Sequence, residues 1–288
     1  MGGLLAQGMG SAGREKGGTK EGMDLQQLKL TPPWEWPENV GRFLQNVVTD
    51  RTANLEDRLT AAEFAGDSTV VDDQVVAVLL GVTADPDTPQ ELREATAIAL
   101  GPVLELADTQ GFDDPDEVPI TEATFHRIQK TLSDLYHDAD VPTDVRRRVL
   151  EASIRAGQDW HKGAVRAAFQ SGDPDWMLTA VFCMRYVVGF EAQIGQALDS
   201  PDPRIHLQAV LAAGESELSA AWGHVAGLAR SESTDKELRL AAIEALAGIQ
   251  PTKSARLLHE LTTSDDPEIS EAAFDALALS GEADDTDV

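Results

Sequence analysis

The residues that could bind a metal ion are not spaced in a way that predicts a site. The six histidines are His126, His137, His161, His206, His224 and His259. No two of them are four residues apart, as ligands on one helix face would be, and none lies beside the single Cys183. Residues 138–144 loosely resemble a calcium loop, but Thr143 and Val149 stand where that loop needs Gly and Glu. We therefore expect no metal ligands in this chain.

The sequence also lacks the short motifs that carry common enzyme chemistry. It has neither a glycine-rich phosphate loop nor the Gly-flanked serine of a nucleophile elbow. Pairs of carboxylates are frequent, but a chain with 50 acidic residues contains them by composition alone. We therefore predict no catalytic residue and no cofactor, and we do not expect an enzyme.

One side chain with binding chemistry does recur at a regular position. These arginines are Arg58, Arg93, Arg146 and Arg239. A row of guanidinium groups could bind anions along a groove. Alternatively, each could hydrogen-bond an Asp or a helix-end carbonyl of a neighbouring repeat and hold the repeats in register. We favour the second interpretation, because arginine readily forms hydrogen bonds of fixed geometry.

The pattern that positions these arginines is clearest between Asp202 and Gly214. Asp-Pro is followed by an apolar residue two positions after the Pro, then by small residues at helical spacing and a Gly. The positions equivalent to His206 are Arg58, Arg93, Arg146, Met177, Arg239 and Ser270. Successive positions in this series are 35, 53, 31, 29, 33 and 31 residues apart. A period of this length accommodates two short helices and two turns, which predicts a helical solenoid.

This pattern resembles the HEAT repeat. The resemblance covers residues 38–281, and it is strongest over 199–281. It implies an all-α fold, a right-handed superhelical α-solenoid of about seven helix pairs. The pairs are expected at 38–50/55–66, 70–84/88–106, 121–138/142–157, 159–171/174–188, 190–199/202–214, 218–231/234–249 and 251–264/266–280. HEAT repeats serve many unrelated roles, so the resemblance implies a fold and no particular function.

The composition bears on the environment and the partners. The net charge is −27, with more Asp (28) than Glu (22) and few Lys (7). Such a surface is typical of proteins adapted to high salt, where repulsion is screened, although an ordinary acidic protein is the alternative. We expect no nucleic-acid partner, since the only basic run is 146–148. No apolar run approaches the ~18 residues of a membrane span, so we expect a cytoplasmic protein without a membrane partner.

Four segments are expected along the chain. Residues 1–22 are Gly-rich and predicted to be a disordered extension, with Met23 as an alternative start of translation. Residues 23–37 carry Trp34 and Trp36 among prolines and are predicted to form a strap that caps the solenoid, although two Trp could also dock a ligand. The solenoid itself covers 38–281, with a surface loop inserted at 107–119. An acidic tail follows at 282–288.

The leading functional hypothesis is a non-enzymatic, monomeric scaffold that binds an unidentified protein partner in the solenoid groove. Most repeats carry charges one and five positions after the residue equivalent to His206. The fourth and fifth repeats instead carry apolar residues there, namely Leu178, Phe182, Leu207 and Leu211. We predict that these four are partly exposed and form one partner-binding patch. Alternatively, adjacent helices cover them.

The second hypothesis is an enzyme. Some HEAT-like proteins are bilin lyases and others are DNA glycosylases. The comparison with the lyases rests on fold alone. The comparison with the glycosylases conflicts with the charge, because a DNA-binding face must be basic.

Overall fold

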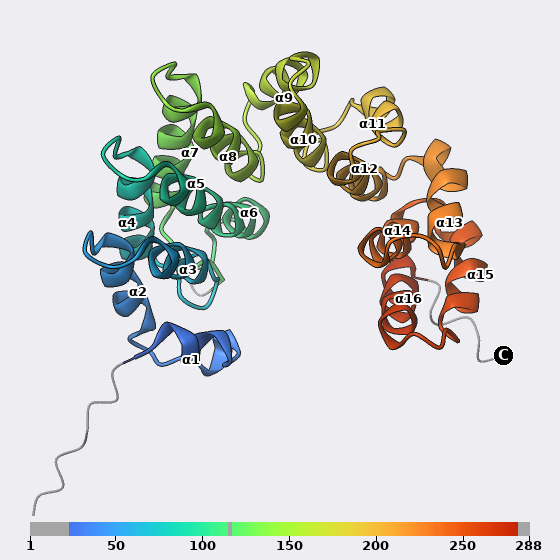
Figure 1. Ribbon diagram of the computed structural model, residues 1–288, viewed down its shortest axis with the longest axis horizontal. Coiled ribbons are helices and arrows are strands. Elements are labelled where there is room, and N and C mark those ends of the chain that lie inside the picture. Colours follow the sequence, from blue (N-terminus) through green and yellow to red (C-terminus); the bar gives the residue numbers. More distant parts are fainter. Residues whose placement is uncertain (1–22, 115–116, 282–288) are drawn as a thin grey trace, which may run out of the picture.

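The computed structural model describes residues 23–114 and 117–281. Helices in these residues form an open arch whose two arms face each other across a concave side (Figure 1). The predicted extension at 1–22 and the predicted tail at 282–288 lie outside the described residues.

Outer and inner helices alternate along the chain in seven pairs within the described residues. The outer helices are α2 (Val40–Thr49), α4 (Asp73–Ala84), α7 (Glu122–His137), α9 (His161–Gln170), α11 (Glu191–Ala197), α13 (Trp222–Arg230) and α15 (Pro251–Leu261). The inner helices are α3 (Leu55–Ala65), α5 (Gln90–Ala99), α8 (Thr143–Ser153), α10 (Pro174–Cys183), α12 (Pro203–Glu215), α14 (Lys236–Gly248) and α16 (Pro267–Ser280). Inner helices of successive pairs pack side by side along the concave side (Figure 1). The predicted all-α solenoid is confirmed.

The Asp-Pro dipeptides start inner helices. The Asp202 carboxylate accepts a hydrogen bond of 2.9 Å from the backbone N–H of Arg204, and Asp173 and Asp266 do the same in α10 and α16. This bond satisfies one of the amide groups that a helix start leaves unpaired. The Pro that follows needs no hydrogen bond there, and its fixed φ suits the first helical position. Asp-Pro is therefore a helix-start signal in this chain.

The recurrent arginines tie each inner helix to the outer helix before it. Nε donates at 2.9 Å to a carbonyl near the end of the outer helix in three pairs: Arg58 to Val48, Arg93 to Thr83 and Arg239 to Ala229. The structural interpretation is thus correct in kind, but the acceptor lies in the same pair and not in a neighbouring repeat. Arg146 differs, since its buried Nε has no hydrogen-bond partner among the described residues.

Glycines allow some inner helices to approach closely. A Cβ on Gly66 would lie 2.6 Å from the carbonyl oxygen of Ala99, and one on Gly214 would lie 2.7 Å from the Cα of Ala245. Neither glycine has a positive φ. The Gly at the end of the repeat pattern therefore serves close packing between α3 and α5 and between α12 and α14, and not an unusual backbone angle.

The apolar core is divided into two clusters that meet at α8. Val145 and Val149 of this helix belong to the N-terminal cluster, and Leu150 belongs to the C-terminal cluster. The contact between α8 and α10 is polar in part. The buried Arg147 donates from Nε to the hydroxyl of Thr179 at 3.2 Å, and that hydroxyl donates to Glu151 at 2.6 Å. These three buried polar side chains thus have partners, which offsets the cost of their desolvation.

Two segments differ in detail from the sequence predictions. The helix expected at 88–106 is broken after Leu100, because Pro102 lies in the first turn of a separate helix, α6 (Gly101–Gln110). This helix occupies the start of the predicted surface loop. The predicted strap begins with a short helix, α1 (Leu25–Lys29), before its proline-rich part.

The two tryptophans of the strap lie in different environments. The Trp36 ring packs on Phe64 of α3 at 5.0 Å between centroids, and its Nε1 donates to the carbonyl of Thr31 at 2.8 Å. The Trp34 side chain is 77% exposed. The strap therefore lies against α3 through one of its two indole rings.

Within the described residues, no helix combines the length and the apolar character that crossing a bilayer requires.

Candidate partner-binding groove

The inner helices of the C-terminal arm form a groove on the concave side. Each of α12, α14 and α16 presents residues spaced three or four apart, so that they lie on one face. Its apolar floor consists of Leu207, Leu211, Leu240, Ala272, Ala276 and Leu279. The hollow has a volume of about 540 Å³. A second hollow of about 250 Å³ adjoins it and shares Leu211, Glu244 and Leu279. We call this surface the C-terminal groove.

Carboxylates surround that floor. The rim residues are Glu237, Glu244 and Asp275 in the larger hollow and Glu215 and Glu217 in the smaller one. No Lys or Arg lines either hollow. Of these five carboxylates, Glu215 alone forms an ion pair with a described residue, with Arg185 at 3.4 Å. The groove is therefore apolar at its base and negative at its edges.

One polar atom at the bottom of the groove has no partner. Gln208 of α12 lines the larger hollow, and its side-chain Oε1 is buried without a hydrogen bond to any described residue. A buried acceptor without a donor is unfavourable.

Two of the four residues that the sequence predicted as one patch line this groove. All four are half-buried and pack against the C-terminal core cluster. Leu207 and Leu211 line the C-terminal groove, whereas Leu178 and Phe182 do not line either of its hollows. Phe182 lies beside Tyr186, at 5.7 Å between ring centroids. The single patch of four residues therefore remains a prediction.

Leu279, the most exposed apolar residue of the groove at 75% exposure, was not among the predicted residues. It lies four residues after Asp275 and eight after Glu271, so it continues the outward-facing row of α16 by one more turn. Extending this row of α16 would have found it.

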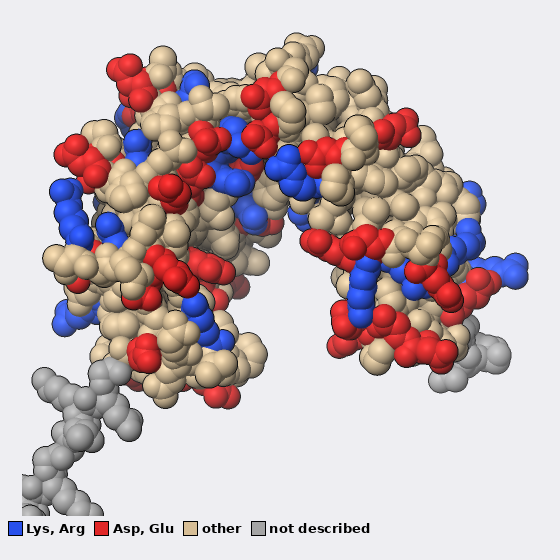
Figure 2. Space-filling view, in the orientation of Figure 1, with Lys and Arg blue, Asp and Glu red and all other residues tan. Residues whose placement is uncertain are grey.

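Basic residues gather under the crown of the arch, and acidic residues are spread over both arms (Figure 2). The crown is where α8, α10 and α12 meet (Figure 1). Three arginines in or next to α8 and α12 pair with carboxylates: Arg148 with Glu151 at 2.6 Å, Arg155 with Glu105 at 2.5 Å and Arg204 with Asp202 at 2.8 Å. These three guanidinium groups are thus neutralised by their own neighbours.

The structure brings one Ser-His pair together, but it is not arranged for catalysis. His161 is fully buried, and burial lowers its pKa to about 4. Its Nδ1 accepts the backbone N–H of Gln158 at 3.1 Å, so Nε2 carries the proton and donates to the Ser153 hydroxyl at 3.1 Å. A general base must accept a proton at that nitrogen. Burial also raises the pKa of the Cys183 thiol well above its usual value, which makes it a poor nucleophile.

Two histidines, His206 and His224, also come together only in the folded chain. Nε2 of His206 and Nε2 of His224 are 2.9 Å apart, so one of them must donate a proton to the other. Burial lowers the pKa of His206, and His224 lowers it further. Within the described residues, no three His, Cys, Asp or Glu side chains are grouped to hold a metal ion.

Comparison with known families agrees with the fold. Residues 225–288 match the family model described as HEAT repeats. The matched region includes α14, α15 and α16, and the pairs before it repeat the same outer-inner design. Residues 225–288 are therefore HEAT repeats, and the pairs before them have the same helical-repeat design. No match was found among curated protein sequences.

Solved structures with some likeness include YibA of Escherichia coli, with 13% identity over 88% of this chain and 95% of that chain, at a TM-score of 0.47. Human deoxyhypusine hydroxylase, in complex with glycerol, has 15% identity over 89% of this chain and 88% of that chain, at a TM-score of 0.40. An engineered protein has 18% identity over 86% and 98%, at 0.33. At these scores the likeness carries no functional assignment.

Proposed function

We propose that this protein is a scaffold that binds a segment of a partner protein in the C-terminal groove. The observation that carries the proposal is the composition of that groove: leucines and alanines from three inner helices, bordered only by carboxylates. An apolar concave strip attracts an apolar face. The carboxylates select a segment whose other residues are Lys or Arg.

A basic amphipathic helix satisfies both requirements. Its apolar face would cover Leu211, Leu240 and Leu279, and its cations would lie near Glu237, Glu244 and Asp275. A segment rich in Glu or Asp would meet repulsion along the whole rim.

The test compares two exposed apolar residues of the same helix. Leu279 lines the groove and Phe274 does not, and their side chains are 75% and 60% exposed. Truncating either should cost the fold little. We expect Leu279→Ala to weaken binding of a synthetic leucine-lysine amphipathic helix by about fivefold or more, the scale of one apolar contact residue. Phe274→Ala should leave the affinity unchanged.

The charge requirement is tested in the same titration. Glu244→Gln should weaken binding, whereas Glu271→Gln, an exposed residue of α16 outside the groove, should have a smaller effect. Equal affinities for Leu279→Ala, Phe274→Ala and the wild type would refute the proposal. Phe182→Ala and Leu207→Ala would be less decisive, because both side chains also pack against the core.

A further inference from the structure

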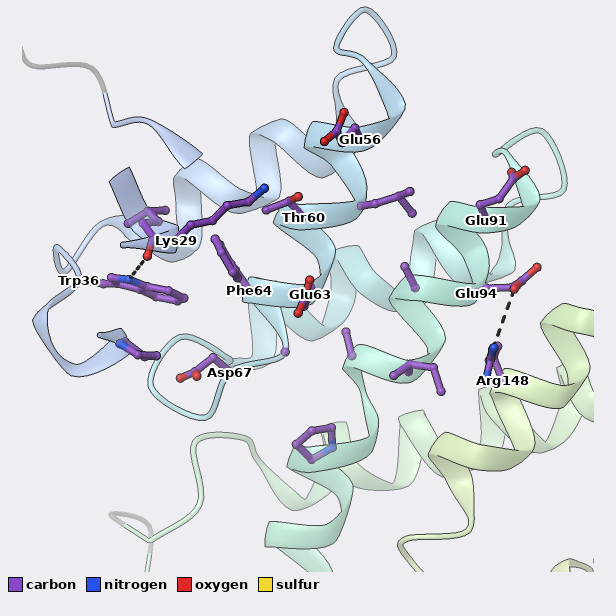
Figure 3. Close-up of a pocket in the computed structure, with 18 of the residues that line it drawn as sticks. Lys29, Trp36, Glu56, Thr60, Glu63, Phe64, Asp67, Glu91, Glu94 and Arg148 are labelled. Carbon is purple, nitrogen blue, oxygen red and sulfur yellow. Dashed lines mark hydrogen bonds and ion pairs between the residues drawn. The ribbon is translucent and has the colours of Figure 1, made fainter. Parts of the chain in front are cut away.

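The N-terminal arm contains a larger groove that the sequence did not indicate. It has a volume of about 920 Å³ and lies between the strap, α3 and α5, with α8 at its far end (Figure 3). Its apolar surface is formed by Trp36, Leu59, Phe64, Ala95, Ile98 and Pro102. We call it the N-terminal groove. It is separated from the C-terminal groove by the crown of the arch (Figure 1).

The wall made by the strap is fixed in position. Trp36 donates from Nε1 to the carbonyls of Thr31 at 2.8 Å and Leu28 at 3.2 Å, and its ring packs on Phe64. Figure 3 shows the two rings side by side at one end of the groove. At the other side Ile98 of α5 is 39% exposed, although it lies on a helix that is otherwise largely buried. The hydrophobic surface is therefore preformed and open to a ligand.

Carboxylates lie along both of the helices that line this groove. Glu56 and Glu63 belong to α3, and Glu91 and Glu94 belong to α5 (Figure 3). Residues seven apart or three apart share one side of a helix, so each pair forms one row. Asp67 adds a fifth carboxylate near Phe64.

The two cations of the groove do not neutralise it. Arg148 lies 4.0 Å from Glu94 and forms a closer ion pair of 2.6 Å with Glu151, which does not line the groove. Burial disfavours its charge, but Glu151 and Glu94 together raise its pKa above the usual value. Lys29 stands at the strap end. Five carboxylates against two cations leave the groove negative.

We infer that the N-terminal groove is a second docking site, and that its occupant is a basic amphipathic helix of a partner protein. The apolar surface with its two rows of carboxylates matches a helix about 10 Å wide that carries apolar residues together with Lys or Arg on the face that docks. Charge complementarity selects this occupant over acidic peptides and nucleic acids, which the carboxylates repel. The inference does not depend on the C-terminal groove, because no lining residue is shared.

The first experiment measures stoichiometry by isothermal titration of the full chain. The probe is the same leucine-lysine helix, of about 18 residues or five turns. We expect two peptides per chain. The double variant Glu56→Gln/Glu63→Gln should weaken one of the two sites by about tenfold, a change of about 1.4 kcal/mol. Glu38→Gln, an exposed glutamate outside the groove, is the control for each charge. Ile98→Ala should weaken the same site, and Leu30→Ala, which is exposed elsewhere, should not.

A local fluorophore separates this site from the other groove. Thr60 lines the N-terminal groove, and the only natural cysteine, Cys183, is buried. Thr60→Cys can therefore be labelled selectively, with Ser68→Cys, an exposed position outside the groove, as the control. We expect the leucine-lysine helix to change the fluorescence at position 60 and not at position 68. The same result is expected when the chain also carries Leu279→Ala, which weakens the C-terminal groove.

Three results would overturn the inference. One is binding of a single peptide that is lost only in C-terminal groove variants. Another is an unchanged signal at position 60. The third is equal binding of a control helix with Glu in place of every Lys. Melting curves of each variant by circular dichroism identify any that fails to fold. Failure of the C-terminal site alone would leave the signal at position 60 intact, so the two proposals fail separately.

Discussion

Replacing Gly214 with Ala tests whether the inner helices are packed as closely as the structure requires. The new Cβ would lie 2.7 Å from the Cα and 2.9 Å from the Cβ of Ala245. Both atoms belong to a short side chain or to the backbone, so neither can rotate away. Because φ at Gly214 is not positive, Ala is compatible with the backbone, and the clash is the only unfavourable change.

The expected magnitude follows from two opposing effects. Ala restricts the unfolded chain and stabilises the fold by roughly 0.4–1 kcal/mol. Overpacking a tight contact costs roughly 1–3 kcal/mol, because α12 and α14 must separate. We expect a net destabilisation of about 1–2 kcal/mol. Gly227→Ala is the control. This residue lies inside α13, and a Cβ there meets nothing within 4 Å. It should be stabilised by roughly 0.5–1 kcal/mol.

The assay is urea unfolding followed by helical circular dichroism, with both variants at one salt concentration. Gly214→Ala should be less stable than the wild type and Gly227→Ala more stable, so that the free energies of unfolding of the two variants differ by about 2 kcal/mol. Ala245→Gly in the Gly214→Ala background should restore only part of the loss, since it removes the contact at 2.9 Å and leaves the one at 2.7 Å. If Gly214→Ala proves as stable as Gly227→Ala, the close approach of α12 and α14 is wrong.

Three further predictions concern charge and burial. Burial lowers the pKa of His161 from 6.5 to about 4, so the unfolded chain binds a proton more readily between these pH values. The stability of the fold should therefore decrease as the pH drops through this window, by about 3 kcal/mol at 1.36 kcal/mol per pH unit. His161→Gln should lack this component in urea titrations from pH 7 to pH 4. Arg93→Met should cost roughly 1–3 kcal/mol, because it removes the donor to the Thr83 carbonyl in a buried position, and Arg239→Met, which is less buried, should cost less in the same assay. The net charge of −27 should make the melting temperature rise from millimolar to molar salt, because the Debye length shortens to about 3 Å. An unchanged melting temperature would contradict adaptation to high salt.

The repeat architecture could be predicted from the sequence because its signals are local. Asp202 and Pro203 act within the first turn of α12, and the buried Ala209 follows at helical spacing. Neighbouring pairs repeat the same arrangement, so an error in one pair does not spread to the next. The break after Leu100 could also have been predicted, because Pro102 is a local helix-breaking signal that lies inside the helix expected at 88–106.

The candidate grooves could be predicted only in part, because exposure depends on residues far away in the sequence. Leu211 and Phe182 occupy the same position of their repeats. Leu211 faces a groove, whereas the guanidinium groups of Arg155 and Arg185 lie over Phe182, at 5.8 and 5.9 Å from the ring centre. Arg155 comes from the preceding pair. The N-terminal groove depends in turn on where the strap places Trp36, which no repeat pattern specifies.

The division of the core at α8 has a consequence for how the protein responds to load and to mutation. Val149 and Leu150 are adjacent in the chain, yet they belong to different apolar clusters. A force or a substitution in α3 therefore acts on one cluster directly. It reaches the other through α8 and through Tyr136 of α7, which packs against both clusters. We expect each arm to open as its own cooperative unit, with α8 setting how strongly opening in one unit affects the other. Native-state hydrogen exchange would show this as two groups of amides with distinct opening free energies, with α8 protected in both.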